Sequence, residues 1–167
     1  MNRDRELLRH FLAAVAYRFQ KAVRGAPAHY PDFNPGHQAR TPAELVRHMA
    51  SLMGYTRTFF RGGSYPMHPD PLPTFEAEVE RFHQLLQAVA DELAAGAELR
   101  GISLKQLLQG PFADAMTHVG QLAMLRRLAD APVPPENFIL ARIDEACLGM
   151  DQAPPASPDD VWPERPA

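Results

Sequence analysis

The sequence has little cysteine, no excess of basic charge and no long uncharged apolar run. Its one cysteine, Cys147, cannot form an internal disulfide, which fits a reducing cytoplasm, and no neighbouring motif marks it as a nucleophile. The formal net charge of −3 leaves no basic excess to neutralise nucleic-acid phosphates. No apolar stretch is long enough to span a membrane, and the first 24 residues fit neither a signal nor a transit peptide. We therefore expect a cytoplasmic protein with no nucleic-acid partner and no membrane contact.

The overall composition is that of a globular protein. Of the 167 residues 46% are hydrophobic and 22% are charged, enough for one domain to bury a core without a disulfide or a structural metal. Only the 17 prolines are unusual, and many of them fall late in the chain. We expect a bundle domain over 1–150 and a Pro-rich tail over 151–167, which carries Trp162.

Apolar residues recur every three or four positions in three segments, which predicts three amphipathic helices. Their expected ranges are 3–23 after an Asn2 cap, 42–60 after a Thr41–Glu44 capping box, and 75–93 after a Thr74 cap. Ser103 is expected to start a short extra helix.

The last bundle helix is expected to open at Gly110-Pro111 and to run past Leu125. Its residues are apolar, small or weakly polar nearly all round, which predicts a helix buried among its neighbours. A further apolar segment, Phe138 to Leu148, is predicted to pack as a helix or an extended arm. The predicted fold is an all-α four-helix bundle with long connections and a short extra helix before the last bundle helix.

Three side chains on two of these helices form a candidate metal site. His48 falls within the apolar stripe of the second helix, which predicts that it points into the core. Asp114 and His118 are four apart and share one face of the last helix, with Gln121 next along it. A buried charge is costly unless it is paired or bound to metal, and two imidazoles with one carboxylate leave coordination positions open for water or substrate.

A purely structural interpretation competes with the metal site. Asp114 would hydrogen-bond His118, while His48 would satisfy a carbonyl or a water elsewhere in the core. Spacing alone favours this interpretation, because D-x-x-x-H pairs are common by chance.

The other candidate residues are interpreted as structural or solvated. His10 and His83 are predicted to be helix-edge residues, and Glu44 is already explained as a capping residue. The loop histidines would line a pocket mouth or be solvated, and the methionines would fill the core. The loop histidines are His29, His37 and His68, and the methionines are Met49, Met53, Met116 and Met124.

The segment His118-Val119-Gly120-Gln121 resembles the H-x-G-Q signature in the last bundle helix of the DinB/YfiT-like family. Leu45 to Met49 resembles the segment around the family's second-helix histidine, and the helix order agrees over roughly Leu7 to Asp130. The resemblance implies a bundle of the DinB/YfiT type that binds zinc, nickel or a similar divalent ion. His48 and His118 match the ligand positions, whereas Asp114 stands where many relatives have histidine. The implied ligands are His48, Asp114 and His118, with Gln121 orienting one of them, and zinc, iron or manganese is favoured over nickel.

Two classes of function stay open. The first is a metal-dependent enzyme acting on a small-molecule substrate, either an S-transferase or isomerase that uses bacillithiol or mycothiol, or a hydrolase. In the thiol mechanism the metal keeps the cofactor sulfur as a thiolate. The second is a non-enzymatic, stress-related bundle protein whose metal is structural or absent and which acts by binding or dimerisation. A homodimer is the expected assembly.

Overall fold

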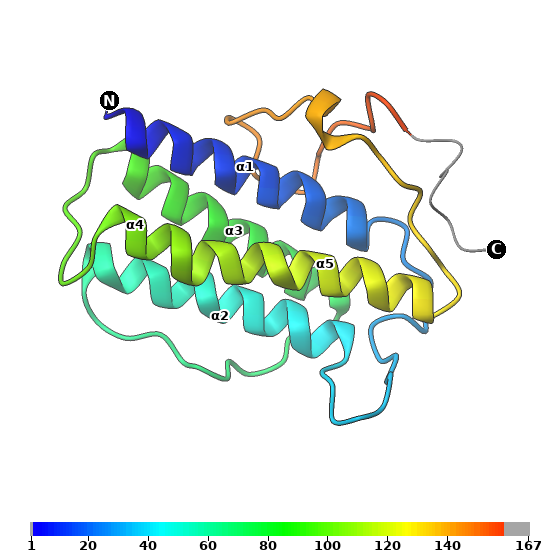
Figure 1. Cartoon of the computed structure of the whole chain (residues 1–167). Coiled ribbons are helices and arrows are strands. Elements are labelled where there is room, and N and C mark those ends of the chain that lie inside the picture. The colour runs from blue at the N-terminus through cyan, green and yellow to red at the C-terminus, as the bar shows by residue number, and fades with distance from the viewer. Residues whose placement is uncertain (1, 159–167) are drawn as a thin grey trace.

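Four long helices pack side by side in the computed structural model, which describes residues 2–158 (Figure 1). They are α1 (Arg3–Val23), α2 (Pro42–Arg61), α3 (Phe75–Ala94) and α5 (Ala113–Leu128). No strand occurs between residues 2 and 158, where the extended pairing is one isolated bridge between Glu136 and Pro158. The all-α prediction is confirmed. The part of the predicted tail beyond Pro158, with Trp162, lies outside the described residues.

The helices run in two opposed pairs, with α1 and α5 in one direction and α2 and α3 in the other (Figure 1). Two ion pairs join α2 to α3, Arg47 with Glu78 and Arg61 with Glu92. Both pairs join residues 31 apart in the sequence, and the separation stays constant along two helices only when they are parallel. Parallel neighbours need a connection as long as the helices themselves. Residues 62–74 supply it and cross the bundle along α2.

This crossing segment is held tightly against α2. The Ser51 hydroxyl donates to the Pro66 carbonyl at 2.8 Å. The Tyr65 ring lies so close to Gly54 that a β-carbon there would be 2.4 Å from a ring atom. The absence of a side chain at Gly54 thus allows the segment that follows Tyr65 to lie beside α2.

Local capping fixes where the helices begin, as the sequence predicted. Asn2 and Thr74 each accept a bond from a backbone N–H of the first helical turn. Thr41 with Glu44 and Ser103 with Gln106 form complete capping boxes, so α2 and the short α4 (Leu104–Leu107) start where expected.

The start of α5 differs from its prediction. A π-helical turn, Leu108–Phe112, joins α4 to α5, and Gly110 within it is non-helical at φ −96° and ψ −107°. Pro111 has no N–H and breaks the regular bonding pattern, so the chain kinks where the helix was expected to open. Regular α-helix begins at Ala113.

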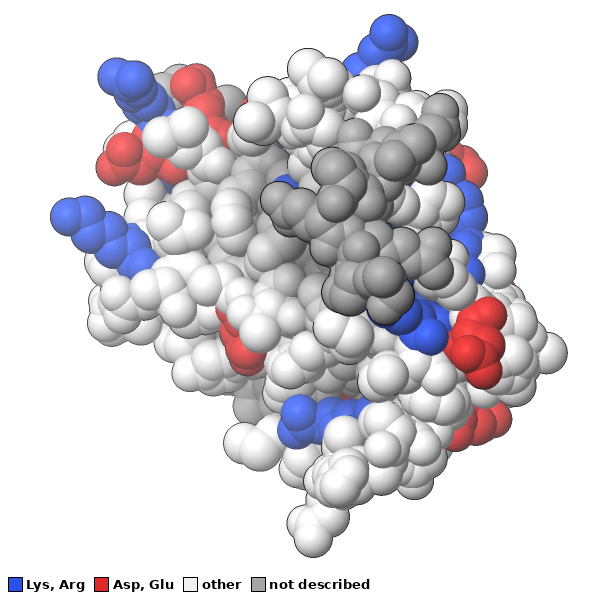
Figure 2. Space-filling view, turned by 45° about the vertical axis from the view of Figure 1, so that its right-hand side comes forward, with Lys and Arg blue, Asp and Glu red and all other residues white. Residues whose placement is uncertain are grey.

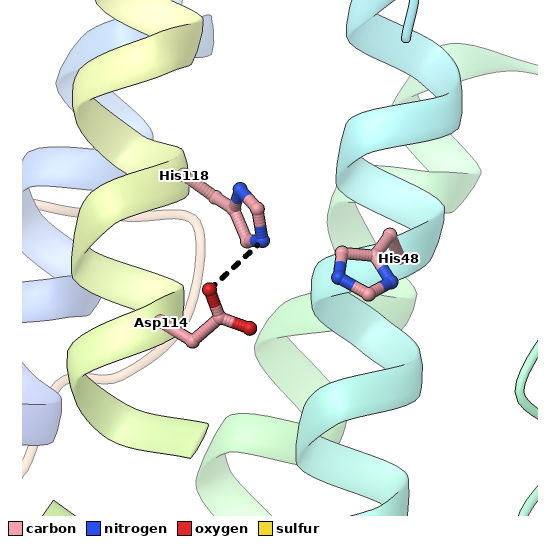
Figure 3. Close-up of side chains that lie close together, drawn as sticks. All are labelled: His48, Asp114 and His118. Carbon is pink, nitrogen blue, oxygen red and sulfur yellow. Dashed lines mark ion pairs between the residues drawn. The ribbon is translucent and has the colours of Figure 1, made fainter. Parts of the chain in front are cut away.

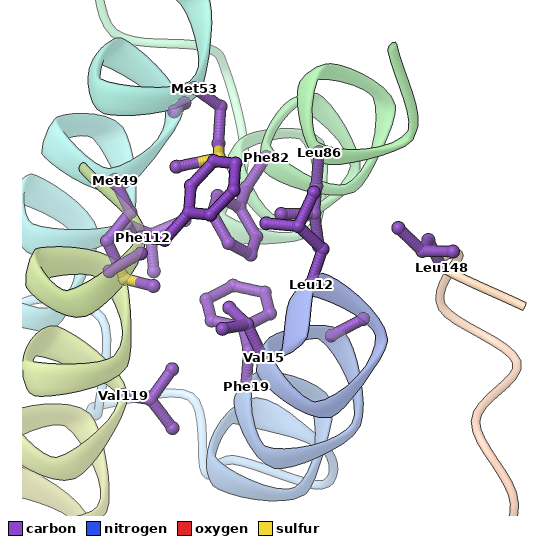
Figure 4. Packing of buried hydrophobic residues seen from close by; sticks show 14 of the residues in the cluster. Leu12, Val15, Phe19, Met49, Met53, Phe82, Leu86, Phe112, Val119 and Leu148 are labelled. Carbon is purple, nitrogen blue, oxygen red and sulfur yellow. The ribbon is translucent and has the colours of Figure 1, made fainter. Parts of the chain in front are cut away.

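The core lies between the four helices (Figure 4). Phe19 of α1 and Phe82 of α3 are fully buried, with ring centroids 4.3 Å apart. Met49 and Met53 fill the space between α2 and the others, as predicted. Leu148 reaches the core from the segment after α5, whose helical part within residues 129–158 is the 3-10 turn η2 (Phe138–Leu140).

Several burial predictions for α5 and α3 were wrong. The last helix is not covered all round, because Gly120 and Gln121 are exposed. Met124 does not fill the core as predicted but is 56% exposed on the open side of α5. Small and weakly polar residues suit a covered and an uncovered face equally well, so composition could not tell them apart. His83 was predicted to be a helix-edge residue but is buried, with 3% of its surface exposed. Its ring can be buried because both of its nitrogens have partners, the Leu148 carbonyl and the Gln20 side-chain amide.

None of the helices between residues 2 and 158 combines the length and the apolar character that a membrane crossing requires. On the face seen in Figure 2, positive and negative side chains are scattered among uncharged ones, and neither sign gathers into one large patch.

Candidate metal centre

His48 of α2 and Asp114 and His118 of α5 lie close together across the space between the two helices (Figure 3). One ligand atom from each of the three lies within 4.8 Å of the others. His118 Nε2 is 3.3 Å from Asp114 Oδ1, and the rings of His48 and His118 meet edge to face with centroids 4.9 Å apart. One nitrogen from each ring and one carboxylate oxygen could therefore hold one metal ion.

The orientation of His118 is fixed by Gln121 on the next turn of α5. The Gln121 amide oxygen lies 2.7 Å from His118 Nδ1, and a carbonyl oxygen only accepts, so Nδ1 carries the donated hydrogen. In the neutral ring Nε2 then presents a lone pair to the site. Metal-binding histidines are commonly oriented in this way by a hydrogen bond at the other nitrogen.

His118 Nε2 is buried and has no hydrogen-bond partner in the described part of the chain, although the Asp114 carboxylate lies beside it. A neutral imidazole nitrogen and a carboxylate oxygen that face each other are both acceptors, so the contact is unfavourable unless a cation lies between them. A proton or a metal ion would supply that charge. The residues present thus fit a divalent metal, with His48 as the third donor.

His48 is held in the form that a metal needs. Burial is the largest cause that lowers the pKa of its imidazole, followed by the positive charge of Arg40 and the neighbouring His118, while Asp114 partly opposes them. A lowered pKa keeps the ring neutral at neutral pH, with a lone pair free for coordination.

The surroundings of two candidate ligands differ from those predicted. His48 does not point into the core but is half-buried at its rim, and the Asp114 side chain is 46% exposed. Burial of an isolated charge is therefore not the reason to place a metal here. The buried nitrogen of His118 is the stronger reason, and sequence patterns could not reveal it.

The structure agrees only in part with the interpretation that these residues have a purely structural role. Asp114 does contact His118, as that interpretation requires. His48, however, makes no hydrogen bond to a carbonyl or side chain among residues 2–158, and its ring turns toward His118. The structure thus brings together the three predicted residues and leaves their ligation a prediction.

Two open clefts adjoin the cluster. One, of about 470 Å³, includes His48 and is bounded by the segment before α2 and by His68 in the crossing segment. The other, of about 540 Å³, includes Asp114 and lies beside Tyr55 and the Pro111 kink. A metal ion at the cluster would be reachable from solvent on both sides.

Sequence reasoning missed Arg40, which lines the first cleft from a segment without any periodic pattern. Of the loop histidines, His68 lines this cleft, whereas His29 lies 3.1 Å from the Ala129 carbonyl at the far end of α5. His37 is exposed outside both clefts. His10 is exposed and pairs with Glu145, as expected of a helix-edge residue.

Comparison with known proteins gave no matching family model, no matching curated protein and no matching solved structure. Fold and site by themselves define a helical bundle with a His-Asp-His cluster that could hold a metal ion.

Proposed function

We propose that this protein is a DinB/YfiT-like bundle that binds one divalent metal ion, with zinc favoured, through His48, Asp114 and His118. The observation that carries the proposal is the buried Nε2 of His118, which faces a carboxylate and has no hydrogen-bond partner among the described residues. Iron and manganese are the alternatives, because a carboxylate in place of a histidine reduces the nitrogen character of the site.

We further propose that the metal serves catalysis. Structural zinc sites are closed by four protein ligands, whereas three ligands beside open clefts leave room for substrate. When bound, the ion would hold a small thiol as its thiolate or activate water, and it would thereby support S-transfer or hydrolysis.

The residues of the chain then have separate roles. Gln121 holds the His118 ring, and Asp114 contributes the negative charge that offsets the ion. Glu44, the carboxylate that lines the first cleft, accepts from the Thr41 backbone N–H at 2.8 Å and is committed to capping α2. This commitment favours thiol transfer over a hydrolysis that needs a free carboxylate base.

A non-enzymatic role by dimerisation is the second candidate. The observation in its favour is the exposed apolar side of α5, where Met124 is 56% and Leu128 is 53% exposed. Such residues suit a helix-to-helix interface between two copies.

Metal analysis of the purified protein tests the first proposal. We expect one ion per chain in the wild type, and a large loss in both His48→Ala and His118→Ala. His10→Ala is the matched control, because His10 is exposed, pairs with Glu145 and is not part of the cluster, so this variant should keep the ion. A stoichiometric ion that survives both substitutions would overturn the site.

Activity is tested separately. Conjugation of chlorodinitrobenzene should require both the metal and a bacterial thiol cofactor. A rate no higher than that of the metal-free protein would count against the enzyme.

A further inference from the structure

One arginine in the lining of the cleft beside His48 has no ion-pair partner. Arg40, Arg47, Glu44 and His68 line this cleft. Arg47 Nε lies 3.0 Å from Glu78, a carboxylate that Arg81 shares, and the Glu44 carboxylate accepts a hydrogen bond from the Thr41 N–H. Arg40 makes no ion pair or hydrogen bond within residues 2–158, so its guanidinium is available to an anion that enters the cleft.

Arg40 lies in the same cleft as one of the proposed ligands. The side chains of Arg40, from the segment before α2, and of His48, from α2, both line this space of about 470 Å³. An anionic group held by Arg40 would therefore share the cleft with an atom bound at His48.

The N-terminus of α2 at this cleft cannot take the role of Arg40. The Ala43 N–H donates to the Pro31 carbonyl and the Glu44 N–H donates to the Thr41 hydroxyl. Pro42 has no N–H to offer. An anion in this cleft would be recognised by side chains and not by free helix amides.

The loop that presents Arg40 has a costly backbone conformation. His37 and Gln38 have φ values of 54° and 60°, a left-handed conformation that costs an L residue roughly 1–2 kcal/mol. Hydrogen bonds from the Gly36 N–H to Asn34 and from the Ala39 N–H to the Gly36 carbonyl close the turn. Backbone strain of this kind is often found at ligand-binding sites.

We propose that the cleft is a carboxylate subsite of the metal centre, in which Arg40 pairs with an anionic group of the metal-bound substrate. The inference rests on the proposed function and narrows it: the substrate or thiol carries a carboxylate in addition to the atom that meets the metal. A planar guanidinium suits a carboxylate because it can donate two parallel hydrogen bonds.

Thiol binding to the Co(II)-loaded protein tests this subsite without any turnover. Sulfur coordination to Co(II) gives a charge-transfer absorption that can be titrated. Three probes of similar size differ in their charge: 3-mercaptopropionate is anionic, propanethiol is neutral and 2-aminoethanethiol is cationic. We expect 3-mercaptopropionate to bind about two- to fivefold more tightly than propanethiol, the advantage of one solvent-exposed ion pair.

The variants assign that preference to one residue. Arg40→Ala should remove it, and Arg40→Glu should reverse it in favour of 2-aminoethanethiol. Arg142→Glu is the matched control: it changes the net charge equally in the exposed segment after η2, which runs over α1 on the opposite side of the bundle from α2 (Figure 1). The control should keep the preference, and added salt should weaken it in the wild type.

The outcomes separate the two proposals. Absence of Co(II) binding would overturn the metal site and, with it, the subsite. Thiols that bind the metal equally well in the wild type and in both Arg40 variants would refute the subsite alone. An unchanged Co(II) spectrum in the variants before thiol addition would establish that their metal site is intact.

Discussion

The hydrogen bond between Gln121 and His118 should tune metal affinity, and Gln121→Leu tests it. The amide oxygen lies 2.7 Å from Nδ1 and selects the tautomer that leaves Nε2 free. Removal of such an orienting partner typically lowers metal affinity about 10- to 100-fold, or about 1.4–2.7 kcal/mol. Gln121 is exposed, so water can partly replace it, and we expect the lower end, about tenfold.

The assay is a competition titration of zinc against a chromophoric chelator, together with chemical unfolding of the metal-free protein. Because Gln121 lies on the exposed side of α5, the metal-free stability should change by less than about 0.5 kcal/mol. Gln121→Glu keeps an acceptor and should restore the affinity. Gln84→Leu is the control, since Gln84 makes an equivalent exposed contact with Glu80 on α3, away from the metal.

Unchanged zinc affinity in Gln121→Leu would refute the reasoning, because the Nδ1 contact would then not decide which nitrogen faces the site. A fall in metal-free stability as large as the fall in affinity would also refute it. The residue would then support the helix and not the ligand.

Three further predictions concern the scaffold. Burial lowers the pKa of His83 to about 4, so the folded state binds fewer protons than the unfolded state below pH 6.5. The free energy of unfolding should therefore fall by up to about 3 kcal/mol as the pH is lowered from 6.5 to 4. The His83→Gln variant should lose this pH dependence. Gly54→Ala should lower the free energy of unfolding by about 1–2 kcal/mol, because the new methyl overlaps the Tyr65 ring by more than the helix gains from alanine. Glu136→Ala should cost about 3 kcal/mol and increase proteolysis between residues 131 and 158, since the buried carboxylate accepts from Tyr17 at 2.6 Å and ties that segment to α1.

Each of these predictions has a matched control. Gly120→Ala meets no atom within 4 Å on an exposed helical position, so it should stabilise the fold by about 0.5–1 kcal/mol, and destabilisation of both glycine variants alike would contradict the overlap argument. Glu145→Ala removes an exposed partner of His10 and should cost less than about 1 kcal/mol, so a loss equal to that of Glu136→Ala would mean that burial is not the cause. His10→Gln should leave the pH dependence unchanged.

The sequence predicted the parts of the fold that local chemistry decides. Caps at Thr41 and Ser103 need only residues within one turn, so these helix starts were correct. The placement of Asp114 and His118 on one helix face follows from the four-residue spacing and was also correct in the structure. These features depend on backbone geometry that is complete before the helices pack.

Only the tertiary structure decided which surfaces are covered and which loops reach the cluster. Met124 is exposed and His83 is buried because of where the C-terminal segment and the neighbouring helices lie, which residue periodicity does not encode. Arg40 comes to lie beside His48 through a left-handed turn in a segment without any repeat. The sequence alone predicted three candidate ligands. The burial of His118 Nε2, which has no hydrogen-bond partner among the described residues, was decided by the packing of the helices.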